Sequence, residues 1–190
     1  DVTATVENLS LIASSIMSKK LAAGSDAILL DVKCGKGAFM KSEEDAKALA
    51  ELMCKIGSSQ GKKTAAIISD MSEPLGHAIG NSLEVIEAIE LLKGNIKGDL
   101  LKLCLNISAA MIYLGGGASG VEEGFALAEN AISSGRALQK LAEMIEYQGG
   151  NKLVIDDYSL FPKAEIYSEI KAESSGYIES IDAEYIGLAS

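Results

Sequence analysis

The first half of the chain alternates between helical and buried-strand patterns of apolar residues. Apolar positions recur at helical spacing over residues 9–23, and a glycine follows as a stop signal. Two short, almost wholly apolar runs, 27–32 and 64–69, predict strands buried on both faces of a parallel sheet. Between them, a serine cap and an acidic first turn predict a helix over 42–56. Strand, helix and strand in this order imply a parallel crossover, so we expect an α/β fold with a parallel sheet flanked by helices.

The second half reads as helical until about residue 162, where the pattern changes. Asn81, with Glu84 three positions later, resembles a capping box at the start of a helix that ends near residue 92. Helices are also predicted over 99–114 and 121–147, the second with a kink at the Ser-Ser-Gly of 133–135. From Lys163 onward, isolated apolar residues alternate with polar ones, which predicts the first strands of a β-rich lobe. These apolar residues are Ile166, Ile170, Tyr177, Ile178 and Ile181.

Composition narrows the class of protein. The chain has 27 acidic and 17 basic residues, a formal net charge of −10 and no Lys/Arg stripe, which argues against binding to nucleic acid. The three cysteines are widely spaced in apolar surroundings, which favours reduced core thiols over disulfides or a zinc site. No apolar run approaches the roughly 20 residues that a membrane helix needs, and no signal segment opens the chain. We therefore expect a cytoplasmic protein that binds neither nucleic acid nor membrane.

Two loops that follow the predicted strands are candidates for binding, because ligands of open parallel sheets bind beyond the carboxyl ends of the strands. The first loop combines Gly35 and Gly37, which let a backbone approach a ligand, with Lys33 and Lys36, which could face an anion. It does not match the phosphate-binding P-loop or the dinucleotide-binding glycine pattern. A solvated glycine-rich turn is the alternative interpretation.

The second loop, 69–81, contains a Pro/Gly turn and leads into a helix with three glutamates. Exposed backbone oxygens and one carboxylate from Glu84, Glu87 or Glu90 would suit a hard cation, although spacing alone favours a solvated acidic helix face. His77 is the only histidine, which excludes a histidine metal cluster within this chain. On the first helix, Ser15 and Lys19 stand four residues apart and share a face, where they could meet a ligand's polar edges. Here too, spacing alone favours a plain polar face.

Taken together, these segments resemble the pyrimidine-nucleoside phosphorylase and thymidine phosphorylase family. The matching stretches are DVTATV at 1–6, LIASSIMSKKLAAGSDAILLDVKCGKGAFM at 11–40 and ISDMSEPLGHAIGNSLEVIEAIELLKG at 68–94. The resemblance extends over essentially the whole chain. It implies the end of a helical lobe at 1–24, a central α/β domain at 25–155 that is incomplete, and the start of a C-terminal lobe at 156–190.

The resemblance also implies an activity, the reversible phosphorolysis of thymidine, uridine or deoxyuridine. Phosphate attacks the anomeric carbon and releases the free base, leaving ribose or deoxyribose 1-phosphate. Negative charge builds on the departing base, so a donor at a base carbonyl stabilises the transition state. The resemblance assigns Ser15 and Lys19 to this base site. It leaves Lys33, Gly35 and Gly37 as possible cleft lining without a catalytic role.

Further implications concern a cofactor, a partner and the extent of the chain. Some members of the family bind a potassium ion, and the resemblance assigns it to the backbone oxygens of Leu75 and Ala78 and the carboxylate of Glu87. No organic cofactor is implied, phosphate is a co-substrate, and the family is homodimeric. The family's phosphate-binding segments would precede Asp1 and most of its C-terminal lobe would follow Ser190. We therefore expect an internal fragment that cannot turn over substrate alone.

Two other classes of function stay open at this point. The chain could be a non-catalytic folded module, or it could belong to the related phosphoribosyltransferases, which share the general architecture. The Ser-x-x-x-Lys helix and the Asp-Met-x-x-Pro-Leu-Gly loop favour the nucleoside enzyme. Binding of phosphoribosyl pyrophosphate would favour the transferase.

Overall fold

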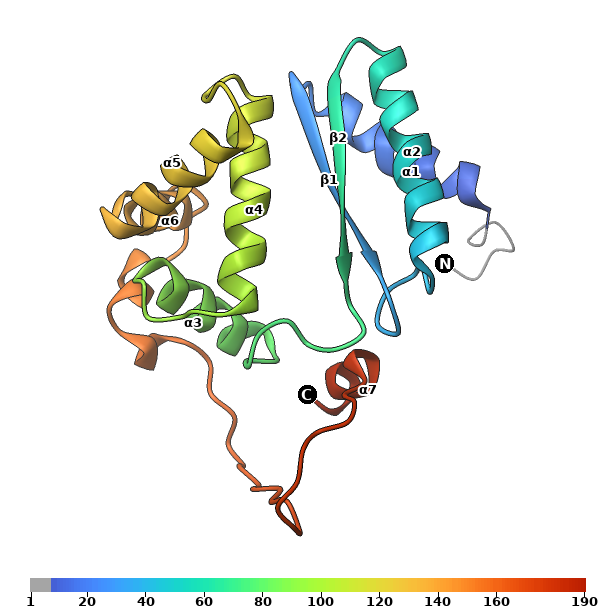
Figure 1. The fold of residues 1–190 in the computed structure, drawn as a ribbon. Helices are drawn as coiled ribbons and strands as arrows, with labels where there is room; N and C mark the ends of the chain where they lie inside the picture. The colour runs from blue at the N-terminus through green and yellow to red at the C-terminus, as the bar shows by residue number, and fades with distance from the viewer. Residues whose placement is uncertain (1–7) are drawn as a thin grey trace. The chain divides into compact units, whose positions relative to one another are not determined.

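A computed structural model of the chain describes residues 8–190, which fold into two compact units (Figure 1). The first unit contains the residues up to Ser72 together with Leu103–Ala128, and the second contains Glu73–Lys102 and Glu129–Ser190. The DVTATV stretch lies outside the described residues. The division into lobes that the family resemblance implies stays a prediction.

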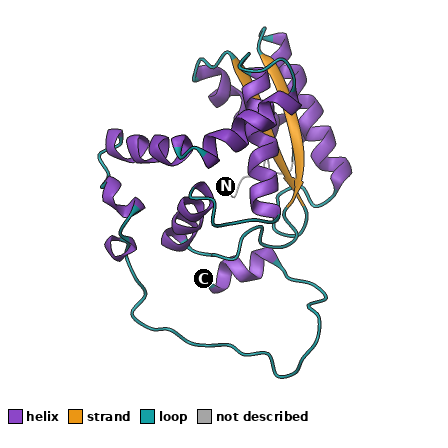
Figure 2. Cartoon of the chain, turned by 60° about the vertical axis from the view of Figure 1, so that its left-hand side comes forward, coloured by secondary structure: helices purple, strands orange, loops and turns teal. Residues whose placement is uncertain are grey.

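The first unit is built around two parallel strands, drawn in orange in Figure 2. Strands β1 (Ala27–Cys34) and β2 (Lys63–Asp70) pair in a register that runs from Ala27 opposite Lys63 to Cys34 opposite Asp70. Helix α2 (Glu43–Ser59) connects them, and helix α1 (Leu9–Ala22) precedes β1. The predicted α/β class and the parallel crossover are confirmed, and both strands extend slightly beyond the predicted runs.

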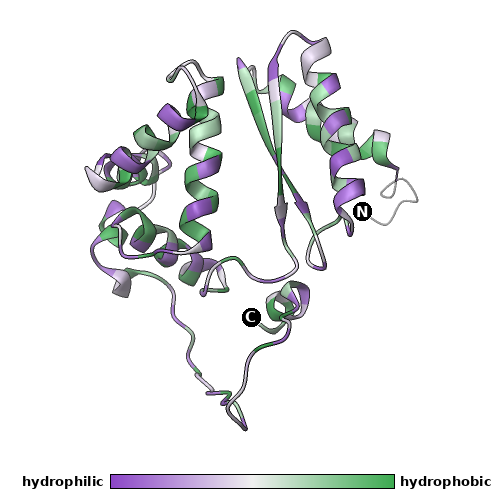
Figure 3. Ribbon diagram, viewed as in Figure 1, coloured by the Kyte–Doolittle hydropathy of each residue, from purple (hydrophilic) through white to green (hydrophobic). Residues whose placement is uncertain are grey.

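The core of this unit lies between the sheet and helices α1 and α2. Alternate residues of β1 are buried, namely Ile28, Leu30 and Val32, and they pack with Met17 of α1 and Met53 of α2. Burying one such side chain contributes on the order of 1.5–3 kcal/mol. Figure 3 shows hydrophobic residues along part of both strands, with hydrophilic residues among them. Because side chains alternate across a strand, Asp31 and Lys33 are directed to the opposite face of the sheet.

Helix caps agree with the sequence in one case and differ in another. The Ser42 hydroxyl accepts a hydrogen bond from the backbone N–H of Asp45 at 3.1 Å and caps α2, as predicted. In the second unit, the prediction that Asn81 caps α3 (Asn81–Leu92) is wrong, because Gly80 occupies that position at φ 117°. The Glu84 carboxylate accepts the Gly80 N–H at 3.1 Å, so the expected acceptor is present and only the cap residue differs.

The remaining helices include one predicted correctly and one that is divided. Helix α4 spans Asp99–Leu114, as predicted. The single helix predicted over 121–147 is instead α5 (Val121–Ser133) and α6 (Arg136–Tyr147). Gly135 separates them at φ 75°, a left-handed conformation that cannot continue an α-helix. Short 3-10 helices follow, η1 at Lys152–Ile155 and η2 at Tyr158–Leu160. Among residues 8–190, none of the helices is both long and apolar enough to span a membrane.

The prediction of β-strands after Lys163 is wrong for the described chain. No strand forms over residues 163–190, and the one regular element there is helix α7 (Ala183–Ala189). Ile170 and Tyr177, which were expected on a strand face, are fully exposed. A strand needs a neighbour for its backbone N–H and C=O groups, and no other strand of the described chain pairs with this segment.

Candidate functional site

A cavity of about 850 Å³ opens in the first unit, lined by α1, β1, α2 and the loop after β1. Most of its wall is apolar. The polar residues along its lining are Ser15 and Lys20 of α1 and Asp31 and Lys33 of β1, and Phe39 on the loop is 55% exposed. An apolar cavity of this size with a few polar groups suits a small, flat ligand with polar edges.

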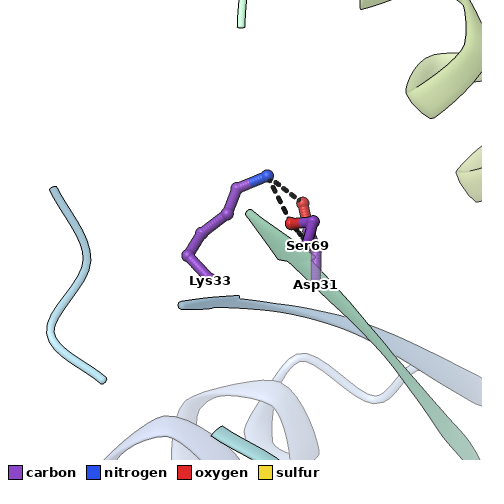
Figure 4. Close-up of polar contacts among 3 residues, drawn as sticks. All are labelled: Asp31, Lys33 and Ser69. Carbon is purple, nitrogen blue, oxygen red and sulfur yellow. Dashed lines mark hydrogen bonds and ion pairs between the residues drawn. The ribbon is translucent and has the colours of Figure 1, made fainter. Parts of the chain in front are cut away.

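Three polar side chains near the carboxyl ends of the strands form a closed hydrogen-bonded ring (Figure 4). Lys33 Nζ donates to Asp31 Oδ2 at 2.6 Å and to Ser69 Oγ at 2.9 Å, and Ser69 Oγ donates to Asp31 Oδ1 at 2.5 Å. The ring follows from the sheet, because Asp31 and Lys33 are two residues apart on β1 and Ser69 is the β2 partner of Lys33. We call it the Asp31–Lys33–Ser69 ring.

The positive charge of Lys33 affects the pKa of a cysteine outside β1. Burial raises the pKa of the Cys104 thiol, and the positive charge of Lys33 acts in the opposite direction and lowers it. Cys104 lies on the part of α4 that belongs to the first unit. Lys33 thus acts on the Cys104 thiol through its charge, although burial is the larger cause of the pKa shift.

The glycine-rich loop after β1 is tied to the loop after β2 by backbone hydrogen bonds. The N–H of Gly37 donates to Met71 O at 2.9 Å, and the N–H of Met71 donates to Cys34 O at 2.6 Å. Gly35 donates its own N–H to Met40 O at 3.0 Å. Because the N–H groups of both glycines are used internally, they are not available to cradle an anion. These backbone bonds hold the loop after β1 and the loop after β2 together at the end of the sheet, and we call this contact the loop brace.

Gly35 is required by a close approach between these loops. Its φ is 115°, and a Cβ atom at this position would lie 2.8 Å from both Asp70 Oδ1 and the backbone nitrogen of Ser72, and closer still to Ser72 Oγ. Asp70 in turn accepts hydrogen bonds from the Ser72 N–H at 2.9 Å and from the Ser72 hydroxyl at 2.7 Å. These bonds lower the pKa of Asp70, the side-chain bond most strongly.

In the second unit, the Glu87 carboxylate on α3 lies against the loop that precedes this helix. The backbone N–H of His77 donates to Glu87 Oε1 at 2.8 Å, and a Cβ atom on Gly76 would lie 2.8 Å from the Glu87 carboxyl carbon. The carboxylate is thus brought to the loop segment that contains Leu75 and Ala78. Oxygen donors of this kind, a carboxylate and nearby loop carbonyls, fit the chemistry of a hard cation.

The structure brings together some of the residues singled out in the sequence. Ser15 and Lys33 line the same cavity, whereas Lys19 is exposed and Lys20 contributes to the wall. Gly35 and Gly37 belong to the loop brace. The functions assigned to these residues and to Leu75, Ala78 and Glu87 stay predictions.

Sequence reasoning did not assign a role to Asp31 or Ser69, which hold Lys33 in place. A signal for Asp31 was present, because it is the one charged residue in an otherwise apolar run over 27–32. Ser69 had no such signal, since its position opposite Lys33 depends on the strand register.

The parallel sheet and its flanking helices define an α/β domain, and the mostly apolar cavity near the carboxyl end of β1 is its candidate ligand site. A family profile described as "Glycosyl transferase family, a/b domain" matches residues 1–138, and the chain belongs to this family. Over all 190 residues it is 53% identical to the pyrimidine-nucleoside phosphorylases of Geobacillus stearothermophilus and Staphylococcus aureus (strain USA300). The chain spans 44% of the length of each of these relatives. The resemblance recognised from the sequence motifs is thereby confirmed.

Proposed function

We propose that the protein represented by this chain catalyses the reversible phosphorolysis of pyrimidine nucleosides to the free base and a pentose 1-phosphate. The observation that carries the proposal is the 53% identity, over the full 190 residues, to relatives named pyrimidine-nucleoside phosphorylase. The mostly apolar cavity, with Ser15, Lys20 and Lys33 among its lining residues, supports it, because a pyrimidine is a flat ring with polar edges.

Within this proposal, Ser15 and Lys19 donate hydrogen bonds to a base carbonyl. The departing base gains negative charge in the transition state, and donors held on one helix face stabilise that charge without reorganisation. Ser15 lines the cavity, and Lys19 follows it by one helical turn. We therefore expect Lys19→Met to lower the rate of base release much more than Lys55→Met, a control on the exposed face of α2 outside the cavity lining.

The test uses a chimera in which residues 1–190 replace the matching segment of the Geobacillus stearothermophilus relative. Release of uracil and thymine from uridine and thymidine is measured with and without phosphate, beside the parent enzyme and the isolated 190-residue chain. We expect phosphate-dependent release by the chimera and none by the isolated chain. A chimera that melts cooperatively like its parent yet releases no base would contradict the proposal. Synthesis of a nucleotide from phosphoribosyl pyrophosphate would favour the phosphoribosyltransferase.

We propose a potassium site at the loop before α3, with the backbone oxygens of Leu75 and Ala78 and the Glu87 carboxylate as ligands. The fit of the carboxylate against this loop supports the proposal. A bound ion would supply a fixed positive charge that ties the loop to the helix. We expect Glu87→Gln in the chimera to raise the potassium concentration needed for half-maximal activity, with Glu84→Gln as the control on the same helix. An unchanged potassium dependence would remove the basis for this site.

We further propose that the full-length protein is cytoplasmic and, as the family resemblance implies, homodimeric. The free cysteines Cys34, Cys54 and Cys104 are compatible with a reducing compartment. Sedimentation equilibrium of the chimera tests the oligomeric state, and a monomer at micromolar concentration would argue against the dimer.

A further inference from the structure

The Asp31–Lys33–Ser69 ring is the feature of the cavity to which neither the family profile nor the base-site assignment gives a role. Asp31 and Lys33 are among the residues that line the cavity, while Ser69, opposite Lys33 on β2, is only 9% exposed and is not part of the lining. An ammonium group has three N–H donors. Asp31 and Ser69 take one each, which leaves one N–H of Lys33 without a partner among residues 8–190. The two anchors fix the direction of this remaining donor.

The ring also fixes the charge of the site. The Lys33 ammonium and the Asp31 carboxylate carry opposite unit charges, so the ion pair as a whole is neutral, and both carboxylate oxygens are engaged, one by Lys33 and one by Ser69. A phosphate dianion placed at Lys33 would also meet the Asp31 carboxylate, whose like charge opposes it. The nearby glycine N–H groups, which could have offset this repulsion, are used within the loop brace. The free donor therefore suits a neutral oxygen better than an anion.

We propose that Lys33 is a further substrate-binding residue, which donates its remaining N–H to a neutral oxygen of the nucleoside, with Asp31 and Ser69 as its positioning residues. The inference rests on the proposed phosphorolysis and adds to it the part of the substrate that β1 recognises. Two neutral oxygens share this chemistry, a sugar hydroxyl and a base carbonyl. Phosphate is bound elsewhere.

The main test is Lys33→Met in the chimera, with Lys55→Met on the exposed face of α2 as the matched control. Methionine keeps the apolar stem and removes the donor. We expect kcat/KM for uridine to fall by about tenfold to a hundredfold, the effect of losing one hydrogen bond to a charged donor, with the KM for phosphate unchanged. Deoxynucleosides that lack the 2′, 3′ or 5′ hydroxyl locate the contact. A nucleoside on which Lys33→Met has no further effect lacks the hydroxyl that Lys33 binds, and an equal loss on all of them assigns the contact to the base.

The positioning residues are tested by readouts that a structural role alone would not change. Ser69→Ala removes one anchor and should lower kcat/KM for the nucleoside by about threefold to tenfold without changing the KM for phosphate. Ser69→Thr keeps the hydroxyl in a strand and should restore the activity. Asp31→Asn leaves Lys33 as an unneutralised cation, so we expect high phosphate concentrations to inhibit competitively with the nucleoside. Melting temperatures of all variants provide the control for folding.

Two results would overturn the inference while leaving the proposed function intact. One is a Lys33→Met chimera with nucleoside kinetics equal to those of the Lys55→Met control. The other is a Lys33→Met chimera in which only the KM for phosphate rises, since Lys33 would then bind the anion. A folded chimera that shows no phosphorolysis even without these substitutions would instead overturn the proposed function, and the inference with it.

Discussion

The loop brace makes Gly35→Ala a strongly destabilising substitution in the first unit. An alanine at φ 115° adopts a conformation that L-residues avoid, at a cost of about 1–3 kcal/mol. Its Cβ would also lie 2.8 Å from the backbone nitrogen of Ser72, which cannot rotate away as a side chain can. Forcing the two loops apart costs about 1–3 kcal/mol more, by analogy with overpacked cores. The expected loss of stability is thus about 2–6 kcal/mol.

Gly61→Ala provides the control for this prediction. Gly61 is also left-handed, at φ 70°, but a Cβ atom there would meet nothing within 4 Å. It should cost only the conformational part, about 1–2 kcal/mol. Because a chain with two compact units need not unfold in one step, the measurement is hydrogen exchange of the β1 and β2 amides in the 190-residue chain. Equal losses of protection in the two variants, within about 0.5 kcal/mol, would refute the close-approach argument.

Three further substitutions test other contacts. Ser72→Ala removes the largest cause of the lowered pKa of Asp70, so this pKa should rise toward its ordinary value and carbon NMR of the carboxyl should detect it. A lowered pKa stabilises the fold above the unfolded-state pKa and loses this effect as pH falls through the folded-state pKa, so the variant should lose less stability on acidification than the parent. Tyr158→Phe removes the hydroxyl that donates to Glu90, which should raise the Glu90 pKa and reduce exchange protection over 152–160 by about 0.5–1.5 kcal/mol. Gly124→Ala would place a Cβ atom 2.5 Å from a backbone oxygen of α4 and should cost about 1–3 kcal/mol in the protection of that helix; unchanged protection would contradict this packing.

The sequence was sufficient to predict the parallel α/β unit, because its signals are local. The apolar runs of β1 and β2 and the Ser42 cap of α2 each occupy a few consecutive residues. Local sequence patterns did not predict the structure correctly where a strand depends on a neighbouring strand from elsewhere in the chain. The alternation around Ile170 resembles a strand, but no strand of the described chain pairs with it, and the residue is exposed.

The candidate site was predicted only in part for the same reason. The Ser15 helix face and the loop after β1 could be read from spacing and motifs. The position of Ser69 opposite Lys33 requires the strand register, and the use of the Gly35 and Gly37 N–H groups requires the contact between two loops that are about 35 residues apart in the chain. A glycine in a loop has the same appearance in sequence whether it approaches a ligand or a neighbouring loop.

A crystal structure of the chimera with uracil and phosphate tests the central claim most directly. The account predicts the base in the cavity lined by α1 and β1, with a base carbonyl within hydrogen-bond distance of Ser15 Oγ, and the phosphate away from the Asp31–Lys33–Ser69 ring. Uracil bound outside this cavity, or phosphate on Lys33, would contradict it.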